Sequence, residues 1–559
     1  MHLAHSSVRR RLLTASLALF GLLVFGEMLA AQSPFGEVVN VRVVNVEVVV
    51  TDGQGVRVTG LGPEDFRLRV DGEDRAIDYF SEIRGGELVP RQESAGKTPE
   101  GAGPRPAADP RGGTSYLVFI DEVFSLASDR DRVLRELVEQ LPQLSPDDRM
   151  AVVAYNSGGL EMLTSWTESG RELERVFKGA MLRSSSAGPL RSQVRAADRD
   201  ELDLDSVATA GDEPDFLGAV PPGVETVQGL DLEDEAIGER WSVEVDKAVS
   251  AASTTLRAFA RPPGRKVMLL LSGGWPFSLS NWIAGRSTPG FRSPRLADGF
   301  ELYSPLTDTA NRLGYTLYPV DMPGLPAVDL MGDAAVDRLA IERRREIEIH
   351  ATLDYLAQET GGRPLIDGDR EAALERVVED TRSYYWLGFT VDPQETLDRQ
   401  KIRVRLHRKG LEARARRNFQ PLTREQEESL QVESALRFGD PPREAPLTVA
   451  LGEPERAGRR RMEVPVQVAI PLDMVTFVPT ADGVEGRLEL RIAAQDEGGD
   501  LSDIPILGIP VRLPQAPEAG KYARFDTSVT LRREKNRLIF SLTDPPTGRT
   551  ASARMDVEP

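Results

Sequence analysis

The sequence predicts a multi-domain α/β plus β protein, in which an alternating α/β domain lies between two β domains. Apolar, strand-like runs recur through the middle of the chain, at 115–120, 150–155, 266–272, 315–320 and 363–366. Helical patterns separate these runs, at 129–141, 171–180, 243–260, 304–313 and 335–360. Alternation of this kind indicates a central, mostly parallel sheet with helices on both faces.

Both flanks of this domain carry β patterns. Residues 36–85 are rich in valine and contain the turn signals Asp52-Gly53 and Asp71-Gly72, which favours a small β-sandwich domain. Residues 445–558 hold alternating runs between Gly- and Pro-rich turns, as in an immunoglobulin-like β domain. We interpret the Pro- and Gly-rich stretch 86–113 and the charged stretch 421–444 as linkers.

Two segments within 114–420 depart from the α/β alternation. Residues 184–240 are acidic and poor in aromatics, which predicts a disordered insertion. Its closely spaced carboxylates from Asp198 to Asp205 suit calcium in principle, but no glycine stands where a tight metal loop needs one. Residues 383–407 pair an aromatic run with a basic one across Asp392-Pro393, which predicts a closing β-hairpin.

Composition excludes several classes of function. The formal net charge of −19 argues against a nucleic-acid partner, because phosphate binding needs a basic face. The chain has no cysteine, which removes disulfides, thiolate metal sites and cysteine nucleophiles. Beyond the N-terminal segment the only histidines are His350 and His407, both interpreted as surface residues. No Gly-x-Ser-x-Gly elbow or Gly-rich phosphate loop occurs, so the sequence predicts no enzyme.

The N-terminus predicts export. Three arginines at 9–11 precede an apolar run from 12 to 31 that ends in small residues. This order is typical of a secretory signal cut before Gln32, and an uncleaved membrane anchor is the alternative. No later segment is apolar enough to cross a bilayer. We therefore expect a periplasmic or secreted protein.

Several motifs occur in one order along the chain. They are Val46-Glu-Val-Val-Val-Thr-Asp-Gly, then Leu269-Leu-Leu-Ser, then Tyr384-Tyr-Trp-Leu-Gly-Phe. In these motifs the chain resembles the VWFA-related domain proteins of the acidobacterial type, which contain a von Willebrand factor type A (VWA) domain. The resemblance implies a Rossmann-like VWA domain at 114–420, flanked by N-terminal and C-terminal β-sandwich domains. It also implies a role in binding a protein at the carboxyl edge of the sheet.

The resemblance implies where a metal would lie. In VWA domains the first loop supplies an Asp and two Ser, the second a Thr and the third an Asp. Here Asp121 and Ser125 remain, Val123 replaces the middle serine, and the third loop reads Ser272-Gly273-Gly274 without an Asp. We therefore expect Asp121 and Ser125 to form a degenerate site without a cofactor, with Mg²⁺, Mn²⁺ or Ca²⁺ as the alternative.

The loop after Asp121 also carries expectations of its own. Without a metal, Asp121 is expected to cap the backbone at the strand end. The neighbouring Glu122 is expected to point away from it, because successive side chains of a strand alternate. In the second loop, Ser242 is the one residue that could replace the family's Thr.

These observations predict a non-enzymatic, protein-binding adhesion or scaffold protein whose partner contacts the carboxyl edge of the sheet. The residues expected to line this partner-binding edge are Ser272, Gly273, Trp275, Phe277 and Trp282. The three aromatics are expected to anchor the interface, with local packing as the alternative. A different class remains open, an extracytoplasmic hydrolase or carbohydrate-processing enzyme with its site in the β domains.

Overall fold

The computed structural model describes residues 42–89, 113–185, 187, 232–260, 262, 264–283, 296–297, 299–322, 335–391, 398–438, 445–480, 482–499, 501–502 and 504–558. The predicted signal segment and most of the linker 86–113 and of the insertion 184–240 lie outside these residues. The end of the predicted insertion is helical, because helix α5 begins at Leu232.

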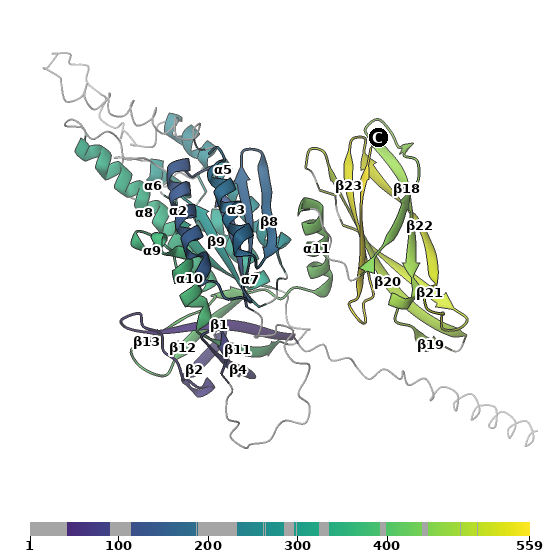
Figure 1. Cartoon of the computed structure of the whole chain (residues 1–559), viewed down its shortest axis with the longest axis horizontal. Coiled ribbons are helices and arrows are strands. Elements are labelled where there is room, and N and C mark those ends of the chain that lie inside the picture. The colour runs from purple at the N-terminus through teal and green to yellow at the C-terminus, as the bar shows by residue number, and fades with distance from the viewer. Residues whose placement is uncertain are drawn as a thin grey trace, which may run out of the picture. The chain divides into compact units, whose positions relative to one another are not determined.

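A five-stranded sheet with the order β10-β9-β6-β7-β8 forms the middle of the α/β part (Figure 1). Its strands are β6 (Thr114–Asp121), β7 (Arg149–Asn156), β8 (Gly159–Thr167), β9 (Arg265–Ser272) and β10 (Tyr315–Asp321). β10, β9, β6 and β7 run parallel, and β8 pairs antiparallel with β7. β6 is buried along its whole length. Its central position explains why its sequence is a continuous apolar run rather than an alternating one.

Helices cover this sheet and create two apolar cores. One core contains Leu117 and Phe119 of β6, and the other contains Val118 and Ile120, because successive side chains point to opposite faces. The helices are α2 (Ala127–Gln140), α3 (Gly170–Met181), α5 (Leu232–Ala258), α6 (Leu279–Ile283), α7 (Gly299–Leu313), α8 (Ala335–Thr360), α9 (Gly368–Glu371) and α10 (Ala373–Arg382). Within the described ranges no helix has the length and apolar character needed to span a membrane.

The N-terminal strands do not form a domain of their own. They are β1 (Arg42–Asp52), β2 (Phe66–Val70), β3 (Glu73–Arg75), β4 (Tyr79–Arg84) and β5 (Glu87–Leu88). They share two sheets with β11 (Tyr384–Val391), β12 (Gln400–Leu406), β13 (Leu411–Arg414) and β14 (Asn418–Phe419). β11 pairs with β4 and β12 with β2, so the predicted closing hairpin 383–407 is replaced by pairs with the N-terminal segment.

Residues 445–557 contain two sheets around one apolar core. One sheet holds β15 (Ala445–Pro446), β19 (Val478–Thr480), β20 (Gly483–Asp496), β21 (Ile506–Leu513), β23 (Asn536–Thr543) and β24 (Thr550–Val557). The other holds β16 (Thr448–Leu451), β17 (Glu455–Arg456), β18 (Arg461–Pro471) and β22 (Tyr522–Arg532). The predicted linker 421–444 contains a helix, α11 (Arg424–Phe438), whose Val432 and Leu436 pack against Ala493 and Ile539 of the first sheet.

The predicted fold class is therefore wrong. Among the described residues, strand residues outnumber helical ones and lie in five sheets in which antiparallel pairs predominate, and a central parallel sheet of the Rossmann-like VWA type is not seen there. The sheet that contains β6 is mixed, because β8, which the sequence did not predict, pairs antiparallel with β7. The run 363–366, predicted as a parallel strand, makes only an isolated bridge between Leu365 and Val320. Pro364 has no backbone N–H to extend the ladder.

A buried carboxylate joins the mixed sheet to the N-terminal β strands. Asp380, near the end of α10, accepts hydrogen bonds from Tyr318 of β10 and from the guanidinium groups of Arg57 and Arg414. Its backbone oxygen accepts a further hydrogen bond of 3.3 Å from Arg265 of β9. The Asp380 side chain is 2% exposed. One carboxylate thus joins β10 and β13 to the segment after β1, which is more than 300 residues from Asp380 in sequence.

Replacement of Asp380 by asparagine is expected to lower the free energy of unfolding by about 3–5 kcal/mol, because it leaves buried guanidinium groups without their counter-charge. Denaturant unfolding of the purified chain measures this change. Glu379→Gln, at the exposed neighbouring position, is the matched control and is expected to change the free energy by less than about 0.5 kcal/mol. Equal effects of the two variants would contradict the role given to Asp380.

Candidate functional site

Strand β6 ends on Asp121, whose side chain is fully buried at the carboxyl edge of the mixed sheet. Its Oδ1 accepts hydrogen bonds from the backbone N–H groups of Val123, at 3.0 Å, and Phe124, at 3.2 Å. Its Oδ2 accepts hydrogen bonds from Oγ of Ser272, at 2.7 Å, and from Nε1 of Trp275, at 2.9 Å. A carboxylate offers about four acceptor sites. The protein itself therefore fills the acceptor capacity of Asp121.

Burial raises the pKa of Asp121 to about 6, because desolvation disfavours the charged carboxylate. The hydrogen bonds from Ser272, the two backbone N–H groups and Trp275 act in the opposite direction. With a pKa of about 6, the group is mostly ionised at neutral pH, and its donors compensate the buried charge. Asp121 caps the loop backbone at the strand end, as the sequence predicts for a site without a metal.

The surroundings of Asp121 do not fit a bound cation. A hard cation needs about six oxygen ligands, whereas the indole N–H of Trp275 is a donor only and points at Oδ2. Ser125, the other predicted ligand, is buried, and its Oγ has no hydrogen-bond partner in the described part of the chain, so the misfit lies at Asp121 and Val123 and not at Ser125. Val123, at the position of the family's middle serine, packs in the apolar core. Nor do the described residues contain a cluster of three or more His, Asp or Glu side chains placed to hold a metal.

The loop after β9 is held close to the loop after β6. A Cβ atom added to Gly274 would lie 2.6 Å from Cδ1 of Phe124, so only glycine fits there without a shift. The carbonyl of Gly274 accepts a hydrogen bond of 3.2 Å from Nε1 of Trp241. Gly273 and Ser272 are also buried. The Ser-Gly-Gly sequence therefore brings the two loops together and directs Trp275 inward.

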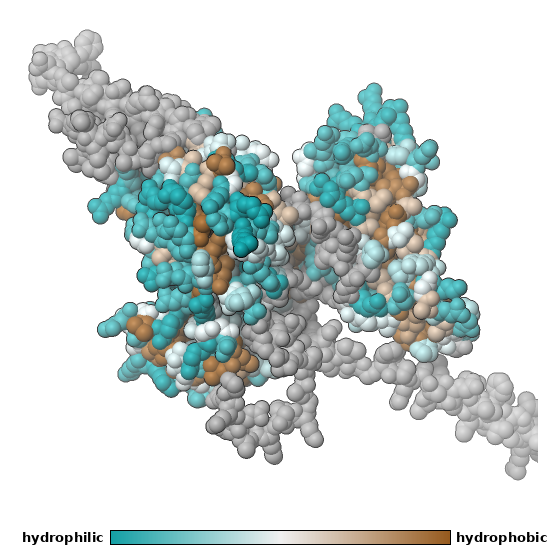
Figure 2. All heavy atoms as spheres, viewed as in Figure 1, coloured by the Kyte–Doolittle hydropathy of each residue, from teal (hydrophilic) through white to brown (hydrophobic). Residues whose placement is uncertain are grey.

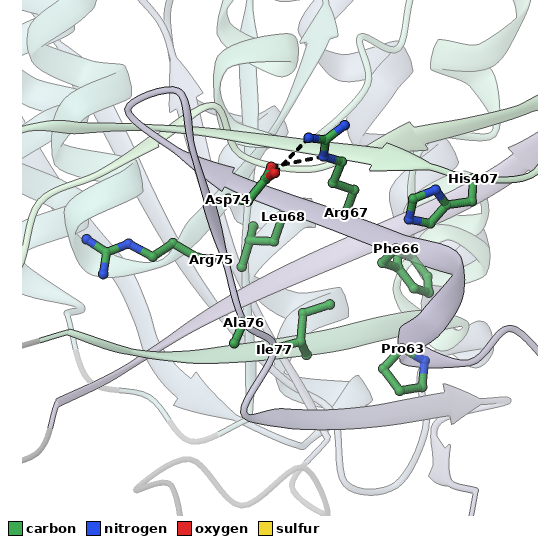
Figure 3. Close-up of a pocket in the computed structure, with 9 residues that line it drawn as sticks. All are labelled: Pro63, Phe66, Arg67, Leu68, Asp74, Arg75, Ala76, Ile77 and His407. Carbon is green, nitrogen blue, oxygen red and sulfur yellow. Dashed lines mark hydrogen bonds and ion pairs between the residues drawn. The ribbon is translucent and has the colours of Figure 1, made fainter.

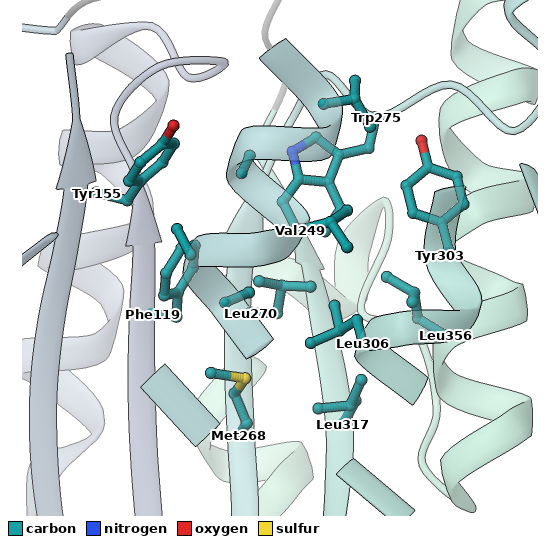
Figure 4. Packing of buried hydrophobic residues seen from close by; sticks show 14 of the residues in the cluster. Phe119, Tyr155, Val249, Met268, Leu270, Trp275, Tyr303, Leu306, Leu317 and Leu356 are labelled. Atoms are coloured by element: carbon teal, nitrogen blue, oxygen red, sulfur yellow. The ribbon is translucent and has the colours of Figure 1, made fainter. Parts of the chain in front are cut away.

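Two of the aromatics predicted as partner contacts lie in the core instead. Trp275 is 0% exposed and Trp282 is 2% exposed. The Trp275 ring stacks on Tyr303 of α7 with 6.0 Å between centroids, among the apolar residues shown in Figure 4. The Trp282 ring lies 4.2 Å from that of Trp241. The local-packing alternative holds for both, because the loop folds back over the sheet, and neither can contact a partner in this structure.

Phe277, the third predicted aromatic, is partly buried in a surface cluster. Its ring makes T-shaped contacts with Phe300 of α7, at 5.2 Å, and Tyr355 of α8, at 5.6 Å. Phe300 also contacts Tyr355, at 5.3 Å, and is 58% exposed. We call Phe277, Phe300 and Tyr355 the aromatic cluster. Phe300 and Tyr355 were not predicted from the sequence, because they lie on helices far from Phe277 along the chain.

Glu122 points away from Asp121, as the sequence predicts, and lies in a buried ion network. Its Oε1 lies 3.2 Å from Nη1 of Arg130 and 2.9 Å from Nε of Arg183. Its Oε2 accepts a hydrogen bond of 3.3 Å from the amide of Asn156. Arg183 also pairs with Glu161, at 2.7 Å. Every carboxylate in this network is paired with arginine, so Glu122 joins α2, through Arg130, to the segment just after α3, through Arg183.

His350 is paired rather than free at the surface. Its Nε2 lies 3.6 Å from Oδ2 of Asp321, the last residue of β10, and Asp321 raises the pKa of His350. Nη1 of Arg370 lies 3.4 Å from the same carboxylate oxygen. Nε2 of His350 has no hydrogen-bond partner among the described residues, so no serine there donates to this nitrogen as the nucleophile of a Ser–His pair would.

His407 lines a shallow surface pocket of about 460 Å³ in the N-terminal β strands (Figure 3). The lining residues are Pro63, Phe66, Arg67, Leu68, Asp74, Arg75, Ala76, Ile77 and His407. Asp74 is its one carboxylate, and Arg67 holds it at 2.6 Å and lowers its pKa. A hydrolase that uses two carboxylates needs one of them protonated, and this pocket does not provide such a pair.

Comparisons with known proteins identify no family. No family model and no curated protein matches the chain. A β-glucuronidase from Bacteroides uniformis has 12% identity, with 31% of this chain and 19% of that chain covered and a TM-score of 0.15. The pilus adhesin SpaC from Lactobacillus rhamnosus GG has 8% identity, with 79% of this chain and 56% of that chain covered and a TM-score of 0.24. Similarities this low carry no argument about fold or function.

Replacement of Trp275 by phenylalanine keeps an aromatic ring but removes the N–H that Asp121 accepts. We expect the free energy of unfolding to fall by about 1–3 kcal/mol beyond the effect of ring size, because one acceptor of a buried charge loses its partner. Trp282→Phe is the matched control, since the buried Nε1 of Trp282 has no hydrogen-bond partner in the described structure. Denaturant unfolding compares the two variants, and equal losses would contradict the importance of the Asp121 contact.

Proposed function

We propose that this chain is an exported, non-enzymatic protein that binds another protein, as an adhesion or scaffold protein. The observation that carries the proposal is the aromatic cluster, which presents Phe300 at 58% exposure beside the loop that follows β9. Exposed aromatic side chains held rigidly by neighbouring rings are typical anchors of protein interfaces.

Hydrogen bonds to Glu348 of α8 fix the loop that carries Phe277 of the aromatic cluster. The backbone N–H of Phe277 donates to the carbonyl of Glu348 of α8, at 3.0 Å. The carboxylate of Glu348 accepts hydrogen bonds from the backbone N–H of Ser278, at 2.8 Å, and from the amide of Asn281, at 3.0 Å. The main chain at this surface is therefore already fixed before a partner binds. The surface loses less conformational entropy on binding than a mobile loop would.

Export is supported by the sequence. The basic start, the apolar run 12–31 and the small residues before Gln32 are those of a secretory signal. A chain without cysteine needs no particular redox environment to keep its fold. The partner is then an extracytoplasmic or secreted protein.

The structure offers less support to the alternative of a hydrolase. The buried carboxylates at the sheet edge accept hydrogen bonds or ion pairs from protein donors, and the surface pocket around His407 has no second carboxylate. Turnover of a glycoside, ester or peptide substrate by the purified chain would overturn the non-enzymatic part of the proposal.

The test of partner binding compares three forms of the chain from Gln32 onward: wild type, Phe300→Ala and Leu182→Ala. Each is immobilised and exposed to extracytoplasmic proteins of the source cell, and affinities are measured for each protein captured. We expect Phe300→Ala to weaken binding at least about tenfold, as for an interface anchor. Leu182→Ala is the control, because Leu182 is 89% exposed and belongs to no aromatic cluster. Equal affinity of wild type and Phe300→Ala would contradict the proposed surface.

A further inference from the structure

Strand β22 is an unusually long strand at the edge of its sheet. It has eleven residues and pairs with β18 over its whole length. In the described structure no second strand pairs with its other side. The free side of a strand presents unpaired N–H and C=O groups, which form a template for another strand.

Other edges of residues 445–557 are shorter or carry proline. β21 has eight residues and contains Pro510, and β15 has two residues and contains Pro446. β16 and β17 have four and two residues. Proline and short length are devices that prevent pairing between edges. β22 contains no proline, glycine or lysine, and its charged residues Arg524, Asp526 and Arg532 all lie on the exposed side, so no charge points inward from this edge.

The inward side of β22 is incompletely covered. The inward side chains of β18, from Met462 to Ile470, are all buried, whereas Ala523, Phe525, Thr527 and Val529 of β22 are only partly buried. Apolar residues reach the surface on the face of residues 445–557 that Figure 2 shows. An additional strand alongside β22 would extend the sheet and cover this row.

We propose that this edge binds a second copy of itself, with β22 antiparallel to the partner's β22 about a two-fold axis at Thr527. The strand is self-complementary in this register. All eleven residues find a facing residue, with Phe525 opposite Val529, Ala523 opposite Leu531 and Tyr522 opposite Arg532.

Neighbouring registers are less favourable. An axis at Asp526 places this carboxylate opposite its own copy, and an axis at Ser528 places Arg524 opposite Arg532. Like charges that face each other directly destabilise a strand pair. The axis at Thr527 faces no like charges, and Asp526 then lies opposite Ser528. This inference is independent of the aromatic cluster and of the partner proposed for it.

Single cysteines test the register, because the natural chain has none. In the chain from Gln32 onward, Thr527→Cys places two thiols opposite each other at the axis, within the Cα separation of about 4.4–6.8 Å that a disulfide requires. We expect this variant to form a disulfide-linked dimer under mild oxidation. Ala523→Cys lies in the same partly buried row but faces Leu531 of the second copy, so we expect no cross-link. Cross-linking of Ala523→Cys, or of neither variant, would overturn the register.

Sedimentation velocity tests the association itself. We expect the wild-type chain to dimerise reversibly, and Val529→Lys to weaken the dimer at least about tenfold, since an inward-pointing charge blocks edge pairing. Leu507→Lys, in the equivalent partly buried row of β21, is the matched control and is expected to dimerise like wild type. Circular dichroism confirms that both variants remain folded. A wild-type chain that stays monomeric at about 100 μM, a concentration at which even weak dimers with micromolar Kd form, would overturn the proposal.

Discussion

The hydrogen bonds to Asp121 determine the geometry of the sheet edge. A carboxylate in the core is tolerated only where donors surround it, and here the donors come from two loops and one tryptophan ring. The chain after β9 turns inward because Trp275 donates to Oδ2 of Asp121. The indole of Trp275 then packs in the core beside Tyr303. The same turn carries the chain on to Phe277 and the aromatic cluster.

The charged groups at this edge of the sheet form hydrogen bonds and ion pairs with other groups of the protein. Asp121 and Glu122 are adjacent in sequence but lie in separate networks, one of neutral donors and one of arginines. Asp380 plays a comparable part at the other end of the sheet, where it joins β10 to arginines next to the N-terminal strands. Buried networks of this kind favour one arrangement of loops, since each partly satisfied alternative leaves a charge unpaired. Binding then depends on what the fixed loops display at the surface.

Local patterns in the sequence predicted the parts of the structure that local forces determine. The apolar runs at β6 and β9, the carboxylate at the end of β6 and the outward turn of Glu122 follow from strand periodicity. The hydrogen bonds to Asp121 were also predictable in part. The sequence lacks the other metal ligands, so a buried Asp121 needs hydrogen-bond donors from the protein, and Ser272 is one of them.

The pairing of strands that are far apart in the chain could not be predicted from the sequence. The predicted N-terminal sandwich and closing hairpin share strands because β2 pairs with β12, more than 300 residues later, and no local signal encodes such a contact. The high charge of residues 421–444 predicts a linker, although helix α11 within them has an apolar stripe of Val432, Ala435 and Leu436. The burial of Trp275 and Trp282 could not be read from a loop sequence, because exposed anchors and buried packing residues have the same composition.

Calorimetric titration of the purified chain from Gln32 onward with Mg²⁺, Mn²⁺ and Ca²⁺, beside Asp121→Asn, tests most directly whether Asp121 serves the fold and not a cation. We expect no saturable binding that depends on Asp121, because its acceptors already hold four protein donors. Saturable binding by the wild type that disappears in Asp121→Asn would contradict this. It would mean that Trp275 and Ser272 give way to a metal and that partner binding depends on it.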